Sequence, residues 1–367
     1  MLKALNFMKT FPAIAGIIAI LLWCNQAQAQ GTCSERLRDA QNLFDAGKLE
    51  EVLKKLSPCL QGGTTWQNKD EEIQAHKTLA LVYLYQDKRP LAEAQMEEIL
   101  KISPLYKLAE TGEVTEYVQL YNSYVVYPRI SIGLKAGLNY LMPSIGTPYS
   151  VNNSQSYLTQ VTSDSISAGY QKTIGPRGGI IVDLLLYDHF FLSAEALINF
   201  RKLSLVDQPY QFTELNYVET MLYIEFPVTV KYTIGNGLVG GFVRAGGNFS
   251  YLVSSYANIT RSFPFAPQEK PVTSNHVNMK PQRTKLDYGP LFGAGISVRL
   301  GTDKLSLETR FRPGFVNITK SNMRYSETSQ MFAFYYIHDD IFLNSLEFSL
   351  GYSHILYKIK KRKVKTN

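Results

Sequence analysis

The sequence has 367 residues, of which 19% are charged and 12% aromatic, with 24 Tyr and a formal net charge of +7. The mean hydropathy of −0.12 excludes a chain built of membrane-spanning helices. It does not exclude a transmembrane β-barrel, because the apolar outside and polar inside of a barrel average to a soluble-looking composition.

The first thirty residues predict export. Lys3 and Lys9 precede an apolar run from Phe11 to Trp23, and Ala27-Gln28-Ala29 supplies an A-x-A cleavage site before residue 30. The apolar run is shorter than the roughly 20 residues that a spanning helix needs. We therefore predict a signal peptide at residues 1–29.

Cys24 leaves one alternative open, which is lipid attachment at that cysteine. Its neighbour Trp23 is bulky where lipoprotein processing needs a small residue, so cleavage after Ala29 is favoured. Much of the excess positive charge lies in a basic tail, residues 359–367, and in Lys358 just before it. An exported chain does not meet nucleic acid, so we expect no nucleic-acid partner.

Residues 30–125 carry a helical period. Apolar residues recur at helical spacing before Gly47 and again after it, up to Ser57-Pro58, which predicts a helical hairpin. Cys33 opens the first helix and Cys59 closes the second, so antiparallel packing brings the two cysteines together. We predict a disulfide between them, for which a loop of about 26 residues gives roughly 3 kcal/mol.

A second hairpin follows Gly62-Gly63, with Pro90 in the first turn of its second helix, and a third helix is expected at about 113–121. The paired units resemble tetratricopeptide-type helical repeats. This resemblance implies a docking surface for a partner protein within residues 33–122. The alternative is a spacer that packs on the mouth of the barrel.

From Pro128 the period changes to two. In the last such segment Phe348, Leu350 and Tyr352 point one way, whereas Glu347 and Ser349 point the other. Each segment reaches the roughly 9–11 residues that a tilted strand needs to cross a bilayer. We predict an eight-stranded antiparallel transmembrane barrel over residues 128–358, with strands at about 129–140, 178–187, 190–203, 217–234, 238–256, 286–300, 304–318 and 341–354.

The connections between these strands alternate in length. Those at 188–189, 235–237 and 301–303 are tight, and those at 141–177, 204–216, 257–285 and 319–340 are long. Outer-membrane barrels have short periplasmic turns and long extracellular loops. The rhythm therefore predicts that both chain ends, and with them the helical domain, lie in the periplasm.

Residues of about 129–357 resemble the PorT-like outer-membrane β-barrel family of Bacteroidota. The resemblance implies location in the outer membrane, and it implies a link to secretion of cell-surface proteins or to gliding, as for some members. The segments that carry it are Ile132-Gly-Leu-Lys-Ala-Gly-Leu-Asn139, Tyr223-Ile-Glu-Phe-Pro-Val-Thr-Val-Lys-Tyr232, Phe292-Gly-Ala-Gly295, Leu307-Glu-Thr-Arg-Phe311 and Leu350-Gly-Tyr352.

Charged residues occupy the predicted inward face. Eight strands enclose an interior just wide enough for side chains to fill, and charges there must be paired. Both signs occur in similar numbers, which favours a salt-bridged plug over a selective pore with one sign at its constriction. The predicted lumen charge network comprises Lys135, Asp183, Glu195, Arg201, Glu225, Lys231, Arg244, Arg299, Glu308, Arg310, Arg312 and Glu347.

Catalysis is the competing function class. His338-Asp339-Asp340 is the one sequence-local cluster of a histidine with carboxylates, as an acid–base pair would need. No Gly-x-Ser-x-Gly, His-Glu-x-x-His or phosphate-binding glycine loop occurs in the sequence. We expect no enzyme activity and no cofactor. Because the other histidines are scattered, we expect no metal site.

The sequence therefore predicts an outer-membrane barrel with a periplasmic helical docking domain, structural in role or part of an envelope or secretion assembly, and non-conducting. Its expected partners are outer-membrane lipid and an envelope protein bound through residues 33–122. The alternatives are a surface enzyme, protease or lipid-modifying, that acts through the extracellular loops, and a small pore.

Overall fold

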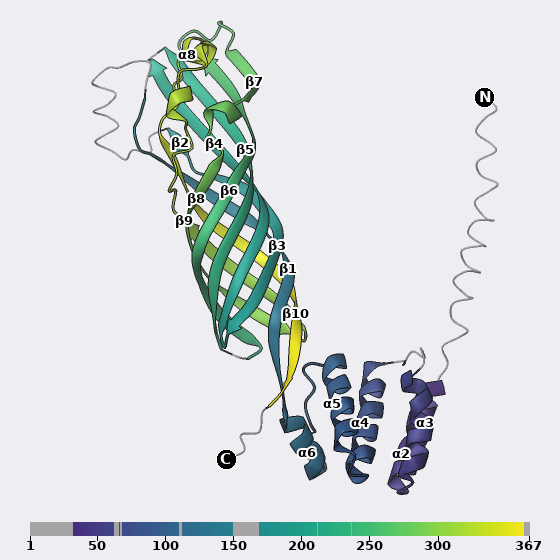
Figure 1. The fold of residues 1–367 in the computed structure, drawn as a ribbon. Coiled ribbons are helices and arrows are strands. Elements are labelled where there is room, and N and C mark those ends of the chain that lie inside the picture. Colours follow the sequence, from purple (N-terminus) through teal and green to yellow (C-terminus); the bar gives the residue numbers. More distant parts are fainter. Residues whose placement is uncertain are drawn as a thin grey trace, which may run out of the picture. The chain divides into compact units, whose positions relative to one another are not determined.

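The computed structural model describes residues 32–61, 66, 68–109, 112–149, 169–210, 212–235 and 237–362. The chain divides into two compact units (Figure 1). One is Met1–Tyr127 with Lys358–Asn367, called the helical unit below, and the other is Pro128–Tyr357, called the barrel unit. The predicted signal peptide with Cys24, the break at Gly62-Gly63 and the last five residues of the basic tail lie outside the described residues.

The described residues of the helical unit form two helical hairpins and a further short helix. Gly47, at a φ of 73°, separates the helices of the first hairpin, and the side chain of Asn68 caps the first helix of the second hairpin. In the part of the chain that the structure describes, no helix is long and apolar enough to cross a membrane. The helices are α2 (Thr32–Asp45), α3 (Leu49–Gln61), α4 (Lys69–Tyr85), α5 (Arg89–Ile102) and α6 (Thr115–Asn122).

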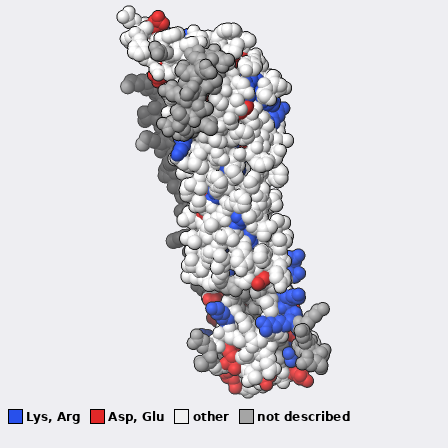
Figure 2. Space-filling model, turned by 90° about the vertical axis from the view of Figure 1, so that its left-hand side faces the viewer, with Lys and Arg blue, Asp and Glu red and all other residues white. Residues whose placement is uncertain are grey.

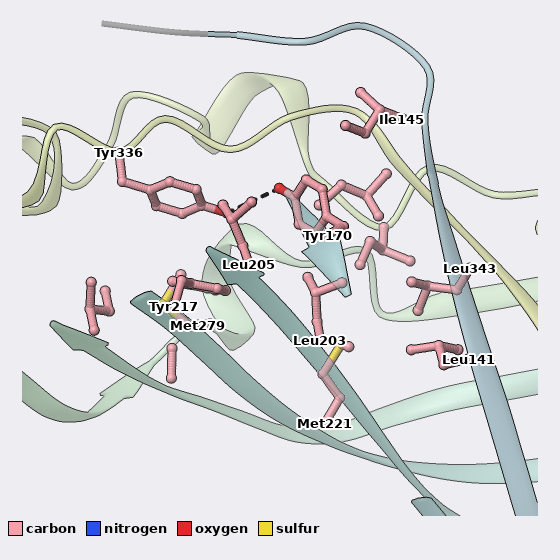
Figure 3. Packing of buried hydrophobic residues seen from close by; sticks show 14 of the residues in the cluster. Leu141, Ile145, Tyr170, Leu203, Leu205, Tyr217, Met221, Met279, Tyr336 and Leu343 are labelled. Atoms are coloured by element: carbon pink, nitrogen blue, oxygen red, sulfur yellow. Dashed lines mark hydrogen bonds between the residues drawn. The ribbon is translucent and has the colours of Figure 1, made fainter. Parts of the chain in front are cut away.

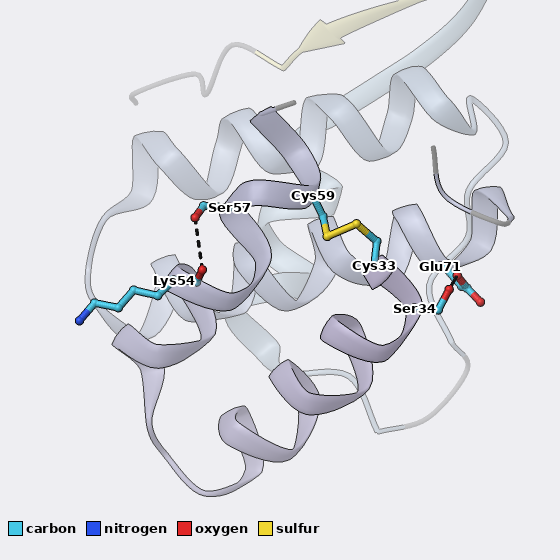
Figure 4. Close-up of a disulfide and its surroundings, with 6 residues drawn as sticks. All are labelled: Cys33, Ser34, Lys54, Ser57, Cys59 and Glu71. Atoms are coloured by element: carbon cyan, nitrogen blue, oxygen red, sulfur yellow. Dashed lines mark hydrogen bonds between the residues drawn. A yellow bond between two sulfur atoms is a disulfide. The ribbon is translucent and has the colours of Figure 1, made fainter. Parts of the chain in front are cut away.

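Helix α3 continues past the proline that was predicted to stop it, and it ends at Gln61. Pro58 lacks the N–H that would reach the carbonyl of Lys54, and the Ser57 hydroxyl donates to that carbonyl instead, at 3.5 Å (Figure 4). A proline in the last turn therefore leaves the helix intact. Cys33 and Cys59 are joined by a disulfide with a Cα–Cα distance of 5.8 Å.

The core of the helical unit includes residues from the start of the first ring strand and from the end of the last one. Tyr124 is buried and Ile359 packs against the same cluster as the helices. Lys361 Nζ lies 2.6 Å from Glu93 Oε2. The segment predicted as a basic tail from residue 359 therefore begins as ordered strand within the helical unit.

Across the described residues, eight long strands form the ring of the barrel and two short ones extend it (Figure 1). Hydrogen-bonded neighbours follow the order β1-β3-β4-β5-β6-β8-β9-β10, and β10 pairs with β1 to close the ring. The short strands β2 (Tyr170–Gln171) and β7 (Val272–Asn278) pair with β4 and β6. The ring strands are β1 (Tyr124–Ile145), β3 (Thr173–Tyr187), β4 (Phe190–Tyr210), β5 (Thr213–Ile234), β6 (Val239–Ser262), β8 (Leu286–Leu300), β9 (Asp303–Arg312) and β10 (Ile341–Lys361).

The predicted number of strands is confirmed, but several boundaries differ. Strand β9 ends at Arg312 rather than at 318, because Pro313-Gly314 follows and proline cannot donate to the ladder. Strands β4, β5 and β6 run beyond their predicted ends at the long loops. The tight turns lie where they were predicted, with Asp188, Gly235 and Gly301 at positive φ.

Strand β5 shows the predicted alternation. Phe226 and Val228 face outward and are 49% and 44% exposed, while Glu225 and Lys231 face the interior and are buried. Exposed apolar residues recur around the ring at the same level, and we call this band the apolar belt, which on β5 spans residues 222–234. In Figure 2 the surface over the strands is mostly uncharged.

Above the belt, toward the long loops, the apolar side chains change face. On β5 the outward residues become Thr220 and Asn216, both exposed, while Leu215 and Met221 are buried inside. These inward residues belong to a hydrophobic cluster that closes the long-loop end and that we call the end core (Figure 3). The strands therefore continue beyond the membrane-facing belt as the wall of a water-facing domain.

Candidate functional site

The centre of the lumen is an ion cluster around Glu195 of β4 and Glu308 of β9. Lys135 Nζ lies 3.2 Å from Glu195 and 2.6 Å from Glu308. Arg244 contacts the same two carboxylates, at 2.7 and 2.6 Å, and Arg310 Nη1 donates to Glu195 at 2.9 Å. Three cations, from β1, β6 and β9, thus share two carboxylates, one from β4 and one from β9.

A second cluster lies nearer the long-loop end. Arg201 Nη1 and Arg312 Nη1 donate to Asp287 Oδ2, at 2.6 and 2.8 Å. Arg201 also pairs with Glu225, which accepts a bond from Arg177 Nη2 at 3.2 Å. Arg177 bridges onward to Glu347 of β10. Side chains from β3, β4, β5, β8, β9 and β10 therefore cross the interior in one connected set.

A smaller cluster lies toward the tight turns. Asp183 pairs with Lys231 and with Lys304, whose Nζ is 3.3 Å from the carboxylate. Phe191 and Phe242 flank Lys231, whose ammonium lies 5.5 and 5.4 Å from their ring centres. The ammonium of Lys231 therefore lies within cation–π distance of two aromatic rings as well as beside Asp183.

The structure buries every residue of the predicted lumen charge network except Arg299. Arg299 is half-buried and in no ion pair among the described residues, and the residue opposite it on β9 is the like-charged Lys304. Sequence reasoning missed Arg177, Asp287 and Lys304. Arg177 shares the parity of Asp183 on β3, so extending that strand toward its start would have found it.

The arrangement of charges favours a filled interior. The clusters combine eight cations (Lys135, Arg177, Arg201, Lys231, Arg244, Lys304, Arg310, Arg312) with six carboxylates (Asp183, Glu195, Glu225, Asp287, Glu308, Glu347), all contacting across the lumen. Opposite charges at about 4 Å attract by roughly 4 kcal/mol at an effective dielectric near 20, before desolvation is subtracted. Opening a water column would separate these pairs.

The end core adds an apolar layer above the ions. Leu203, Leu252 and Leu343 are at most 1% exposed, and they come from strands spread around the ring. A buried ion pair between Arg283 and Glu219 contacts this layer. Arg283 donates from Nε to Glu219 at 2.9 Å and from Nη2 to the Tyr217 hydroxyl at 3.2 Å. The signal that would have revealed this core is the change of apolar parity along β4 and β5.

The His338-Asp339-Asp340 segment lies in the loop before β10; His338 and Asp339 are buried and Asp340 is half-buried. His338 Nδ1 is 3.4 Å from Arg283 Nη2, and burial together with the Arg283 and Arg324 charges holds the pKa of His338 well below its usual range. Among the described residues, no carboxylate is hydrogen-bonded to this imidazole.

The two carboxylates of that segment are occupied by other donors. Asp339 accepts from the Tyr149 backbone N–H at 2.6 Å and from the Tyr170 hydroxyl at 3.1 Å, and burial raises the pKa of Asp339 to about 6. Asp340 pairs with Arg324. Both carboxylates of the segment therefore contact residues outside the segment. Across the described residues, no group of three or more His, Cys, Asp or Glu has the arrangement of a metal site.

A protein-family model described as "Outer membrane protein beta-barrel domain" matches residues 118–320 of this chain. The match begins in α6 and extends through the first six ring strands and β9. Among curated proteins, none matches this chain.

Solved structures similar to this chain include three outer-membrane proteins. Neisserial surface protein A is 10% identical over 61% of this chain and 97% of its own, with a TM-score of 0.28. The attachment invasion locus protein Ail of Yersinia pestis is 7% identical over 62% and 99%, with a TM-score of 0.25. The outer membrane protease OmpT of Escherichia coli is 8% identical over 63% and 98%, with a TM-score of 0.22. Scores this low support no inference about function.

Proposed function

This chain belongs to the outer membrane protein β-barrel domain family, and from that premise we propose that it is a closed, non-conducting barrel that carries a helical docking unit in the periplasm. The observation that carries the proposal is the filled lumen. Ion clusters centred on Glu195 and Glu225 span the interior, and the end core lies above them. Eight strands leave no width for these side chains and a continuous water column together.

The docking role rests on the helical unit. Its hairpins α2–α3 and α4–α5 repeat one motif, as in tetratricopeptide-type repeats, and such stacked hairpins offer a surface for a partner protein. The Cys33–Cys59 disulfide fits an oxidising compartment. We propose the periplasm, because short turns lie at the barrel end where both strand termini emerge, and short turns are periplasmic in this class.

We further propose that the barrel is of the PorT-like type and serves an envelope or secretion assembly through a protein partner held by residues 33–122. We also propose that the chain is not an enzyme. The surroundings of His338 support the absence of enzyme activity, because its Nδ1 faces Arg283 rather than a carboxylate.

Planar-bilayer recording tests the closed barrel. Purified full-length protein and a variant without residues 33–122 should both insert, as judged by heat-modifiable gel migration, and neither should give stable ohmic steps. Steps from the full-length protein would refute the plug. Steps from the truncated variant alone would make the helical unit a gate.

Crosslinking in native membranes tests the docking role separately. The full-length protein should capture one recurrent envelope protein, and the variant without residues 33–122 should insert normally but lose it. Capture that persists in the truncated variant would place the binding surface on the barrel instead.

A further inference from the structure

Three lysines at the long-loop end lack carboxylate partners. The segments 279–286 and 316–324 contain Lys280, Arg283, Lys285, Lys320 and Arg324 and no acidic residue. Arg283 pairs with a glutamate of β5, and Arg324 pairs with an aspartate of its own loop. Lys280, Lys285 and Lys320 are in no ion pair within the described ranges.

These lysines lie close together. A β-bridge between residues 283 and 319 joins the two segments, and Lys320 Nζ is 3.2 Å from the carbonyl of Pro281. Lys280 Nζ donates to the carbonyl of Val253 at 2.6 Å. The carbonyl of Lys285 accepts from the Leu252 N–H at 2.8 Å, next to the Val253 that Lys280 contacts, and Lys285 is exposed. An ammonium group has three N–H donors, so each lysine that bonds one carbonyl keeps donors for an anion.

An exposed apolar surface begins directly beside these lysines. Leu286 is 62% exposed, and Tyr251 lies opposite it on β6. Tyr288 continues the same outward face of β8, and its ring centre is 6.0 Å from that of Phe315 in the following loop. Residues 286 and 288 stand at the upper edge of the apolar belt, so the lysines lie at the level where hydrocarbon gives way to headgroups.

We propose that Lys280, Lys285 and Lys320, together with Tyr251, Leu286 and Tyr288, bind one membrane lipid whose headgroup carries a phosphate. The aromatic and leucine side chains contact the acyl chains, and the ammonium groups contact the phosphate oxygens. Charge complementarity selects this occupant, because three uncompensated cations at an apolar boundary match the anionic headgroup of an amphiphile and not an uncharged one.

The chain supplies a matched control on another face. Lys172 and Lys202 are also exposed beside the belt residue Ile174, and they too are in no ion pair within the described ranges. Lys172 lies between β2 and β3, and Lys202 lies on β4, so both are away from β6 and β8. Replacing them changes the net charge at the belt edge but leaves the proposed lipid site intact.

The test is native mass spectrometry of the full-length protein in detergent, titrated with phosphatidic acid or with diacylglycerol of the same acyl chains. We compare the wild type, the triple variant K280Q/K285Q/K320Q and the control K172Q/K202Q. Heat-modifiable migration verifies folding of each. Inorganic phosphate, added in excess, separates a lipid site from a site for the free anion.

The wild type and the control should bind one phosphatidic acid at least tenfold more tightly than diacylglycerol, and the triple variant should lose that preference. Excess inorganic phosphate should displace little of the lipid, because it lacks the acyl contacts. Equal binding by the wild type and the triple variant would overturn the proposal, as would equal loss in the control. Complete displacement by inorganic phosphate would overturn it in favour of a free-anion site.

Discussion

The middle of the lumen and the end core are built from the same strands by opposite rules. At the level of the belt, β5 turns Phe226 outward and Glu225 inward, whereas above it β5 turns Thr220 outward and Met221 inward. Apolar side chains always face the less polar side, and that side changes from lipid to interior where the membrane ends. Whether the apolar residues of a strand point outward or inward therefore shows whether lipid or water surrounds the barrel at that level.

The two layers also differ in what stabilises them. Ion pairs fill the middle, where desolvation offsets much of the Coulomb attraction and a broken pair is costly. The end core is close-packed like a soluble domain, with Leu252 fully buried. Substitutions should therefore act through unpaired charge in one layer and through cavities in the other.

The largest effect is expected in the middle layer. Glu195→Gln keeps the volume but leaves Lys135, Arg244 and Arg310 with one carboxylate fewer, so it should lower the free energy of unfolding by about 3–5 kcal/mol. Urea unfolding from lipid vesicles measures this. Glu269→Gln, in an exposed loop, is the control and should change little. A loss below about 1 kcal/mol for the Glu195 variant would show that the cluster is not desolvated.

In the end core the expected effect is a cavity. Leu252→Ala should cost about 2–5 kcal/mol in the same unfolding assay, because Leu252 is fully buried among apolar neighbours. Leu238, beside a tight turn, is 67% exposed, and its replacement by alanine should cost far less. Similar losses for both leucines would argue that the long-loop end is not packed.

The boundary between the layers is tested by two substitutions on one face of one strand. Phe226→Arg places a charge in the belt and should cost about 2–4 kcal/mol. Thr220→Arg lies six residues away on the same outward face, above the belt, and should stay within about 0.5 kcal/mol of the wild type. Equal costs in vesicle unfolding would place the membrane edge elsewhere.

The smallest effect concerns the loop over the end core. Burial raises the pKa of Asp339 to about 6 in the folded protein, above its usual 3.8, so the folded state holds the proton more tightly. This stabilisation is fully present below about pH 4 and is lost as the pH rises through 6. The total loss of folding free energy is about 3 kcal/mol.

Hydrogen–deuterium exchange of amides 324–340, corrected for intrinsic rates, follows this loop. Protection should fall between pH 4.5 and pH 7 in the wild type, while Asp339→Asn should show a flat profile. The groups facing the carboxylate are Tyr149, Tyr170, Asp207, Arg324 and Tyr336. A fall of equal size in the Asn variant would assign the pH dependence to one of the others.

Much of the barrel follows from sequence periodicity. Alternation at period two, with tight turns at Asp188, Gly235 and Gly301, determines the strand number and the inward residues, because strand geometry leaves no other choice of face. Lys135 and Glu347 were predictable for that reason. Their partners were not, because pairing depends on register between strands that are distant in the sequence.

Other features depend on three-dimensional context. Arg299 has the inward parity but lies at the rim opposite the like-charged Lys304, and it is in no ion pair among the described residues. The end core was not predicted. Its apolar residues lie at the inward-facing positions of the strands, which in the belt are polar. Ser57-Pro58 predicts a helix stop, whereas α3 continues to Gln61, and the Ser57 hydroxyl donates to the Lys54 carbonyl that Pro58 cannot reach.

Thiol accessibility tests the central claim, a lumen closed at the level of the membrane. Ser349 faces the interior from β10, is 3% exposed, and its hydroxyl has no hydrogen-bond partner among the described residues, so Ser349→Cys should fold normally. In vesicles this thiol should resist a membrane-impermeant maleimide from either side, while Thr220→Cys, on the exposed wall above the belt, should react readily. Modification of both thiols at similar rates would contradict a closed lumen.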